Sequence, residues 1–136
     1  MTSKALFVFS ALALVWCSNA AAERFEPMGS RNVDEVRVYA QGACEPEGLC
    51  RTIADADAIA ALVAFVDDRR EAAMSSGTRA PPIRIEFYRD GFMRGYLGVD
   101  RESFELVDYF VRGASAAEIE EISRLAGLDP RWFGAE

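Results

Sequence analysis

The fold is decided by residues 83–99, which read IRIEFYRDGFMRGYLGV. From Ile83 to Tyr88, apolar and polar side chains alternate, as they do in a strand with one buried and one solvated face. Asp90-Gly91 is a typical hairpin turn sequence. Phe92 to Val99 is therefore predicted to return as a second strand, antiparallel to the first.

The length of this turn determines which side chains are buried. A two-residue loop at Asp90-Gly91 would mix charged and apolar side chains on one face. A three-residue loop, with Gly91 in the left-handed conformation of a bulge, pairs Tyr88 with Phe92 and keeps the faces apart. We predict the second register, because a slip of one residue moves every side chain to the other face. Its buried face comprises Ile83, Ile85, Phe87, Met93, Gly95, Leu97 and Val99.

The opposite face of the same hairpin carries the candidate partner-binding residues. The predicted register pairs Tyr88 with Phe92, Glu86 with Arg94, and Arg84 with Tyr96. Such pairs either stabilise an ordinary sheet or form a partner surface, since Tyr and Arg are frequent anchors of interfaces. On the second interpretation the binding residues are Arg84, Tyr88, Phe92, Arg94 and Tyr96, and replacing Arg94 and Tyr96 together by alanine should leave the fold intact.

Two segments have the pattern of amphipathic helices. Residues 54–74 carry apolar side chains at helical spacing, and Asp55 or Asp57 can cap the first turn. Ser115-Ala116-Ala117-Glu118 is a capping box that opens a second helix, which Gly127 ends. The apolar tail Arg131-Trp132-Phe133 then either packs on its own domain or serves as a docking peptide.

The remaining strands complete the predicted architecture. Val33 to Tyr39 is expected to form the first strand, and residues 103–112 form either one bent strand or two short ones. The order β-α-β-β-β-α predicts an α+β fold. It is a two-layer sandwich in which an antiparallel meander of about four strands carries two helices on one face.

The N-terminal residues 1–22 have the pattern of a secretory signal peptide. Lys4 precedes an apolar run from Ala5 to Trp16, and small residues follow it, so cleavage is expected between Ala20 and Ala22. The alternative is a retained N-terminal anchor or a buried helix. We expect residues 23–32 to be a flexible lead-in and residues 33–136 to be a single α+β domain, exported to the periplasm or secreted.

Cysteine use agrees with export. Cys44 and Cys50 are close in sequence, with Pro46 and Gly48 between them, and in an exported chain they predict a disulfide. A redox or metal-binding pair is the alternative, but the spacing is not that of a thioredoxin-like motif. Cys17 is expected to leave with the signal peptide, although lipidation at Cys17 would make the chain a lipoprotein.

Composition excludes several common chemistries. The chain has no histidine, so histidine-dependent nucleophilic triads and histidine metal sites are ruled out. Its formal net charge of −7 makes nucleic acid an unfavourable partner. No phosphate-binding loop or dinucleotide motif is present, and we expect no cofactor, no metal and no membrane span after cleavage.

These observations favour a non-catalytic exported binding protein whose partner is another exported or envelope protein, such as an inhibitor, immunity-type or accessory protein. The alternative is a small envelope enzyme or polysaccharide-binding domain that uses carboxylates. Its candidate acidic residues are Glu86, Glu105 and Asp108, which are on or near the predicted sheet.

Overall fold

Seven strands form one antiparallel sheet in the computed structural model, which describes residues 26–69, 75–76, 80–106 and 110–134. The spatial order is β2-β1-β4-β5-β6-β7-β3. The strands are β1 (Glu35–Ala40), β2 (Leu49–Ile53), β3 (Ser75–Ser76), β4 (Ile83–Arg89), β5 (Phe92–Val99), β6 (Ser103–Leu106) and β7 (Phe110–Gly113). The α+β class is confirmed, with more strands than the expected four.

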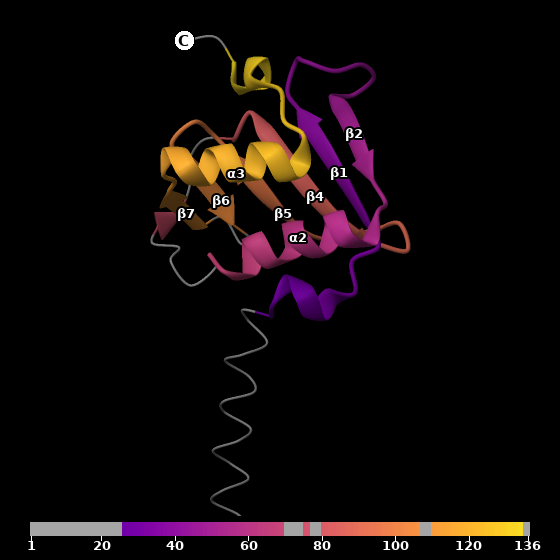
Figure 1. Ribbon diagram of the computed structural model, residues 1–136. Coiled ribbons are helices and arrows are strands. Elements are labelled where there is room, and N and C mark those ends of the chain that lie inside the picture. Colours follow the sequence, from indigo (N-terminus) through magenta and orange to yellow (C-terminus); the bar gives the residue numbers. More distant parts are fainter. Residues whose placement is uncertain (1–25, 70–74, 77–79, 107–109, 135–136) are drawn as a thin grey trace, which may run out of the picture.

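Two helices cover one face of this sheet, and Figure 1 shows them side by side across the strands. They are α2 (Ala56–Asp67) and α3 (Ala116–Ala126). Two short 3-10 helices complete the layer, η1 (Met28–Arg31) beside α2 and η4 (Pro130–Phe133) near the C-terminus. The two-layer sandwich with both helices on one face therefore agrees with the prediction.

The predicted caps at the start of both helices and the predicted glycine stop of α3 are confirmed. The Asp55 side chain accepts a hydrogen bond from the Ala58 backbone N–H at 2.9 Å. Ser115 and Glu118 form the capping box, with both hydrogen bonds at 3.1 Å. Gly127 adopts a φ of 66°, the left-handed conformation in which a glycine ends a helix without a Cβ penalty. The first helix is shorter than the predicted span of residues 54–74, because α2 ends at Asp67 with Asp68 as its C-cap; residues 70–74 lie outside the described residues.

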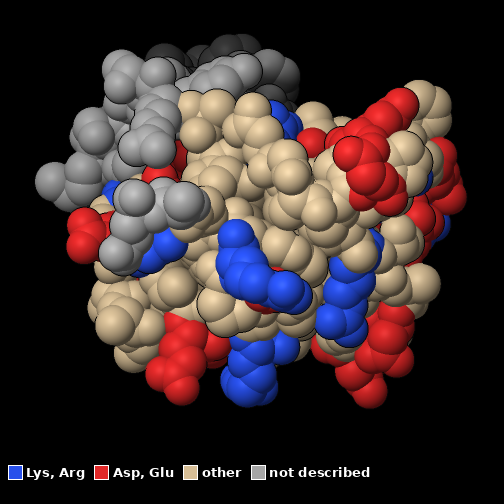
Figure 2. All heavy atoms as spheres, turned by 90° about the horizontal axis from the view of Figure 1, so that it is seen from above, with Lys and Arg blue, Asp and Glu red and all other residues tan. Residues whose placement is uncertain are grey.

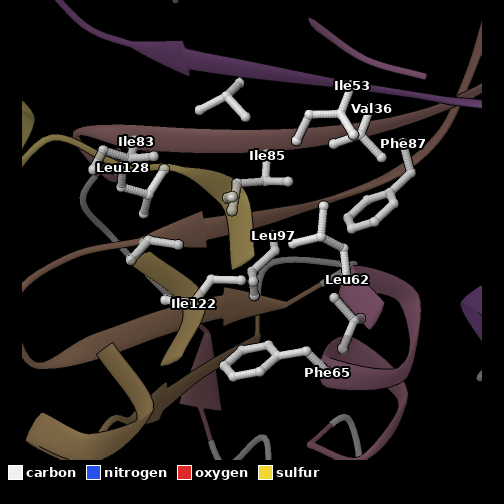
Figure 3. Close-up of a cluster of buried hydrophobic side chains, with 14 of the residues drawn as sticks. Val36, Ile53, Leu62, Phe65, Ile83, Ile85, Phe87, Leu97, Ile122 and Leu128 are labelled. Carbon is white, nitrogen blue, oxygen red and sulfur yellow. The ribbon is translucent and has the colours of Figure 1, made fainter. Parts of the chain in front are cut away.

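The space between sheet and helices is filled by apolar side chains only, because no buried polar or charged residue is found in the described part of the chain. Figure 3 shows aliphatic and aromatic side chains of the strands pointing toward those of both helices. Phe65 of α2 packs edge-on against Phe104 of β6, with ring centroids 5.5 Å apart. Burial of this kind is the main favourable term in folding.

The observed register of the β4–β5 hairpin differs from the predicted one near the turn. Arg89 faces Phe92, so the loop is the two-residue turn Asp90-Gly91, and its φ angles of 51° and 82° are those of a tight hairpin turn. The extra residue is Arg94, because Tyr88 faces Met93 while Phe87 faces Gly95. This β-bulge returns the rest of β5 to the expected face, so Gly95, Leu97 and Val99 are buried as predicted.

Met93 is a second correction, because it precedes the bulge and is 49% exposed instead of buried. The predicted strand pairs also change. Tyr88 does not face Phe92, and Glu86 faces Tyr96 rather than Arg94. The sequence contains no signal that distinguishes a glycine bulge in the turn from a bulge three residues later, since both keep the buried faces together.

Strand β2 was not expected, because its residues follow the predicted disulfide loop without clear alternation. It pairs antiparallel with β1, with Val36 opposite Ile53. The Cys44–Cys50 disulfide closes the loop between the two strands. The loop therefore connects a hairpin and does not lead directly into α2.

The two alternatives for residues 103–112 are resolved in favour of two antiparallel strands, β6 and β7. The apolar tail packs on its own domain, since Trp132 and Phe133 lie against the core. In the expected lead-in segment, Met28 is 2% exposed, so this part of the segment packs on the domain. Within the described ranges, no helix is long and apolar enough to cross a membrane.

Candidate functional site

The candidate site is the face of the sheet that α2 and α3 leave uncovered, here called the open face. Burial alternates along β1 and β4, so every second side chain lies on this face and keeps contact with solvent. Strands β5 and β6 contribute one tyrosine and one glutamate. The open face consists of Glu35, Arg37, Tyr39, Arg84, Glu86, Tyr88, Tyr96 and Glu105.

The β1 side of the open face is organised by an arginine between a carboxylate and an aromatic ring. Arg37 Nη2 donates to Glu35 Oε2 at 2.9 Å, and the guanidinium lies 4.0 Å from the centre of the Tyr88 ring. The hydrogen bond with Glu35 raises the pKa of Arg37 above its ordinary value. Arg37 is thus held in one geometry although its side chain is 32% exposed.

Tyr88 connects Arg37 to Glu86, which lies two residues earlier on the same strand, β4. Its hydroxyl donates to Glu86 Oε1 at 2.5 Å. Partial burial raises the pKa of Tyr88, and the hydrogen bond with Glu86 raises it further. The tyrosine therefore stays protonated and acts as a donor at neutral pH, not as a general base.

The same three kinds of contact, arginine with glutamate, arginine with a tyrosine ring, and tyrosine hydroxyl with glutamate, occur again toward β6. Arg84 Nε lies 3.2 Å from Glu86 Oε2, and the Arg84 guanidinium lies 4.2 Å from the centre of the Tyr96 ring. The Tyr96 hydroxyl donates to Glu105 Oε1 at 3.0 Å. Carboxylates, arginines and tyrosines thus form one continuous network across four strands.

The structure separates the five candidate residues into two groups. Arg84, Tyr88 and Tyr96 lie on the open face, whereas Phe92 and Arg94 lie at the end of the β4–β5 hairpin. Arg84 faces Gly98, not Tyr96, but it reaches the Tyr96 ring diagonally.

Tyr96 is only 9% exposed. Its replacement by alanine would therefore disturb the packed sheet, so the expectation that the Arg94/Tyr96 double variant leaves the fold intact is revised.

Sequence reasoning missed the β1 half of the open face. Glu35, Arg37 and Tyr39 alternate with buried residues, and this pattern was visible in the sequence. It could not be assigned to the same surface as Tyr88, because the pairing of β1 with β4 is set by the tertiary fold. Two strands can be assigned to one shared face only when both the alternation of their side chains and the order of the strands are known. The sequence provides only the alternation.

The hairpin end next to the open face is apolar and exposed. Phe92 is 73% exposed and Met93 is 49% exposed, and these are the exposed large hydrophobic residues of the described chain. Met93 lies opposite Tyr88, so the apolar end continues the aromatic part of the open face. We call Phe92, Met93 and Arg94 the hairpin tip.

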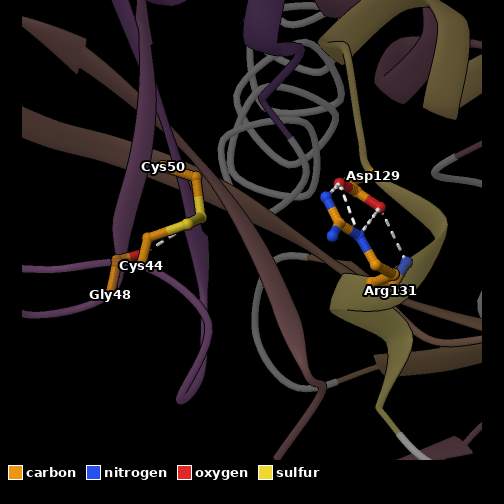
Figure 4. Close-up of a disulfide and its surroundings, with 5 residues drawn as sticks. All are labelled: Cys44, Gly48, Cys50, Asp129 and Arg131. Carbon is orange, nitrogen blue, oxygen red and sulfur yellow. Dashed lines mark hydrogen bonds and ion pairs between the residues drawn. A yellow bond between two sulfur atoms is a disulfide. The ribbon is translucent and has the colours of Figure 1, made fainter.

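The disulfide is confirmed and lies in a separate region. Cys44 and Cys50 are bonded, and Cys50 Sγ lies 3.5 Å from the Gly48 carbonyl oxygen (Figure 4). A bonded pair has no free thiolate to hold a metal. In the described ranges, no group of three or more His, Cys, Asp or Glu side chains is arranged to hold a metal ion.

Figure 4 also shows the Arg131 guanidinium against the Asp129 carboxylate, with Nη2 and Oδ2 2.6 Å apart. This hydrogen bonding lowers the pKa of Asp129 to about 2. Asp129 also accepts from the Arg131 backbone N–H at 2.9 Å, so its role is to begin η4. Such a carboxylate is a poor general acid, which needs a raised pKa.

The end of the molecule that carries η4 has no patch of one charge sign in the view of Figure 2. Figure 2 looks down on the end that carries η4, and it shows basic and acidic side chains interspersed with uncharged residues.

Comparison with protein-family models, with curated proteins and with solved structures gave no match to this chain.

Proposed function

We propose that this chain is a small, exported, non-catalytic binding protein that recognises another exported or envelope protein through the open face and the hairpin tip. The observation that carries the proposal is Met93, which exposes an apolar side chain opposite Tyr88 of the open face, at a hairpin tip where Phe92 is exposed as well. Exposed apolar groups bordered by Tyr and Arg are characteristic of protein interfaces. An inhibitor, immunity-type or envelope accessory role fits such a surface.

The open face supports this proposal because its side chains are already ordered. Arg37 and Arg84 each lie over a tyrosine ring and beside a glutamate. A long side chain that is ordered before binding loses less conformational entropy when the complex forms. The face therefore combines the residue types of an interface with a low cost of ordering them.

Export is part of the proposal. The disulfide is compatible with an oxidising compartment, where such bonds persist. The signal peptide expected over residues 1–22 lies outside the described residues, and in this proposal it directs the export.

No observation favours the carboxylate enzyme or the polysaccharide-binding domain. On the open face, Glu86 accepts from Tyr88 and Glu105 accepts from Tyr96, so both carboxylates already have partners. Asp108, the third candidate, lies outside the described residues. A catalytic acid would need a free approach to substrate and a raised pKa.

The test is site-specific photo-cross-linking in the producing cells. A photoreactive amino acid replaces Phe92 in one strain and Glu120, an exposed residue of α3, in a control strain. We expect one protein adduct from position 92 and none from position 120. Adducts of equal yield and identity from both positions would show that the hairpin tip is not a specific interface.

The partner identified in this way permits a quantitative test. Phe92→Ser combined with Arg94→Ala should weaken binding roughly thirtyfold, as expected for the loss of an interface hot spot. Arg124→Ala on α3 is the control and should leave the affinity unchanged. An affinity that is the same in the double variant and the wild type would overturn the proposal.

A further inference from the structure

A groove of approximately 580 Å³ is lined by residues of η1, of the segment after it, and of α2. Both helices lie on the covered side of the sheet, away from the open face (Figure 1). The lining of the groove includes Ala54 and residues from Ala56 to Asp67, so it follows α2 over its whole length, about 18 Å at the usual helical rise. A groove of this length and volume is narrow. It suits a row of side chains better than one compact ligand. The apolar part of the lining includes Val33, Ala56, Ile59, Ala60, Val63 and Ala64.

The wall formed by η1 is held in place. The backbone N–H groups of Met28 and Gly29 donate to the two oxygens of Asp67, at 2.7 and 2.9 Å. The Met28 side chain is 2% exposed and anchors η1 in the core. The groove is therefore formed before any ligand arrives, which lowers the cost of binding.

The α2 side of the groove allows close approach. Ala56, Ala60 and Ala64 are four residues apart and form one ridge on the exposed side of the helix. Because their side chains are single methyl groups, a second helix can pack against this ridge at a short interaxial distance. The ridge extends over about 12 Å, which corresponds to two turns of a partner helix.

All charged groups that line the groove are acidic. They are Asp34 and Asp67, and none of the described arginines lines it. Asp57 in α2 and Asp68 at its C-cap, both exposed, add two more carboxylates along this helix. An apolar groove with an acidic border is complementary to an apolar ridge flanked by cations.

We propose that this groove is a docking site for an amphipathic helix of a partner protein, whose apolar side chains enter the groove and whose Lys or Arg side chains face the acidic border. Recognition of a helix by an apolar groove is a common binding mode. The inference does not depend on the function proposed for the open face, because the two surfaces share no residue.

The test uses a defined probe and the purified, isotopically labelled protein. A peptide of about 14 residues made of Leu and Lys at helical spacing is titrated while backbone amide shifts are recorded. A second peptide carries Glu in place of Lys. We expect the Lys peptide to shift the amides of Ala56, Ala60, Val63 and Ala64, and the Glu peptide to leave them unchanged.

Two variants of α2 and α3 complete the design. Ala60→Arg places a cation in the groove and should weaken binding of the Lys peptide on the order of tenfold or more. Ala117→Arg makes the same change on the exposed side of α3 and should have no effect. Absence of shifts in the groove, equal binding of both peptides, or equal weakening by both variants would each overturn the proposal.

Discussion

Ile85 faces Leu97 on one side of the β4–β5 ladder, and one residue further along Glu86 faces Tyr96 on the other. The first pair has no exposed surface, whereas Glu86 reaches solvent and joins a network of hydrogen bonds and ion pairs. The covered face is stabilised by burial, which depends little on direction. The open face depends on individual contacts between specific atoms, which are weaker and geometrically selective. Substitutions should therefore have large effects on stability on the first face and smaller ones on the second.

The largest effect is expected on the covered face. Phe104→Ala should lower the free energy of unfolding by about 3–5 kcal/mol, because it removes a fully buried ring that packs against Phe65. Chemical denaturation of purified protein measures the change. Phe104→Leu keeps most of the volume and provides a folded comparison if the alanine variant does not accumulate. A loss below about 1 kcal/mol for both would contradict the assigned core.

The disulfide is a covalent constraint on the chain, and it is separate from the packing of either sheet face. Cys44→Ser should lower stability by about 2 kcal/mol, because a short covalent loop restricts the unfolded chain. The measurement is the thermal midpoint under oxidising conditions. A reductant should lower the midpoint of the wild type and leave that of Cys44→Ser unchanged. Labelling of free thiols in the native mature protein, which lacks Cys17, should give no product, and rapid labelling would show that the bond is absent.

Glu118 tests a charged network that supports the covered side. Its Oε2 lies 2.7 Å from Arg69 Nε and 3.2 Å from Arg112 Nη1. The hydrogen bond from the Ser115 backbone, followed by those from the arginines, lowers the pKa of Glu118 below its ordinary value of 4.5. Glu118→Gln should therefore cost about 1–2 kcal/mol near neutral pH.

The sign of the pH dependence follows from this lowered pKa. The ionised carboxylate contributes its full stabilisation above the unfolded value of 4.5 and loses it as the pH falls through the lower folded value. The difference between wild type and Glu118→Gln should therefore be constant near neutral pH and shrink below 4.5. Urea titrations across this range measure it, and a difference that grows on acidification would contradict the assignment.

A smaller effect is expected on the open face. Tyr96→Phe keeps the ring beneath Arg84 and removes the hydroxyl that donates to Glu105. We expect a loss of about 1 kcal/mol, the usual net value of one hydrogen bond. Denaturant midpoints of Tyr96→Phe and Phe104→Ala are compared, and they give the ratio of the stability losses on the two faces. A loss as large as that of the core variant would show that the two faces contribute equally to stability.

The smallest effect on stability is expected at the hairpin tip. Phe92→Ser changes a side chain that is 73% exposed, so the free energy of unfolding should change by less than about 0.5 kcal/mol. Thermal unfolding of the variant checks this. A large loss would mean that Phe92 serves the fold, and the surface would no longer be a candidate for binding.

Local sequence rules were sufficient wherever one segment contains all the relevant information. The Ser115–Glu118 capping box, the Asp55 cap and the Gly127 stop were all predicted, because each depends on hydrogen bonds within one turn of chain. The buried face of β4 was also predicted, since period-2 alternation needs only the strand itself. The disulfide belongs to the same class, because only two cysteines remain close together in the predicted mature chain.

The features that were missed all depend on which segments meet. Strand β2 exists because β1 offers it a partner, and the bulge at Arg94 depends on how β5 pairs with β4. The open-face network joins Arg37 of β1 to Tyr88 of β4 across many residues of chain. Alternation and capping act over a few bonds and are therefore encoded locally. Strand order, bulge position and the contacts between faces follow from the packing of distant segments, which balances burial across the whole core.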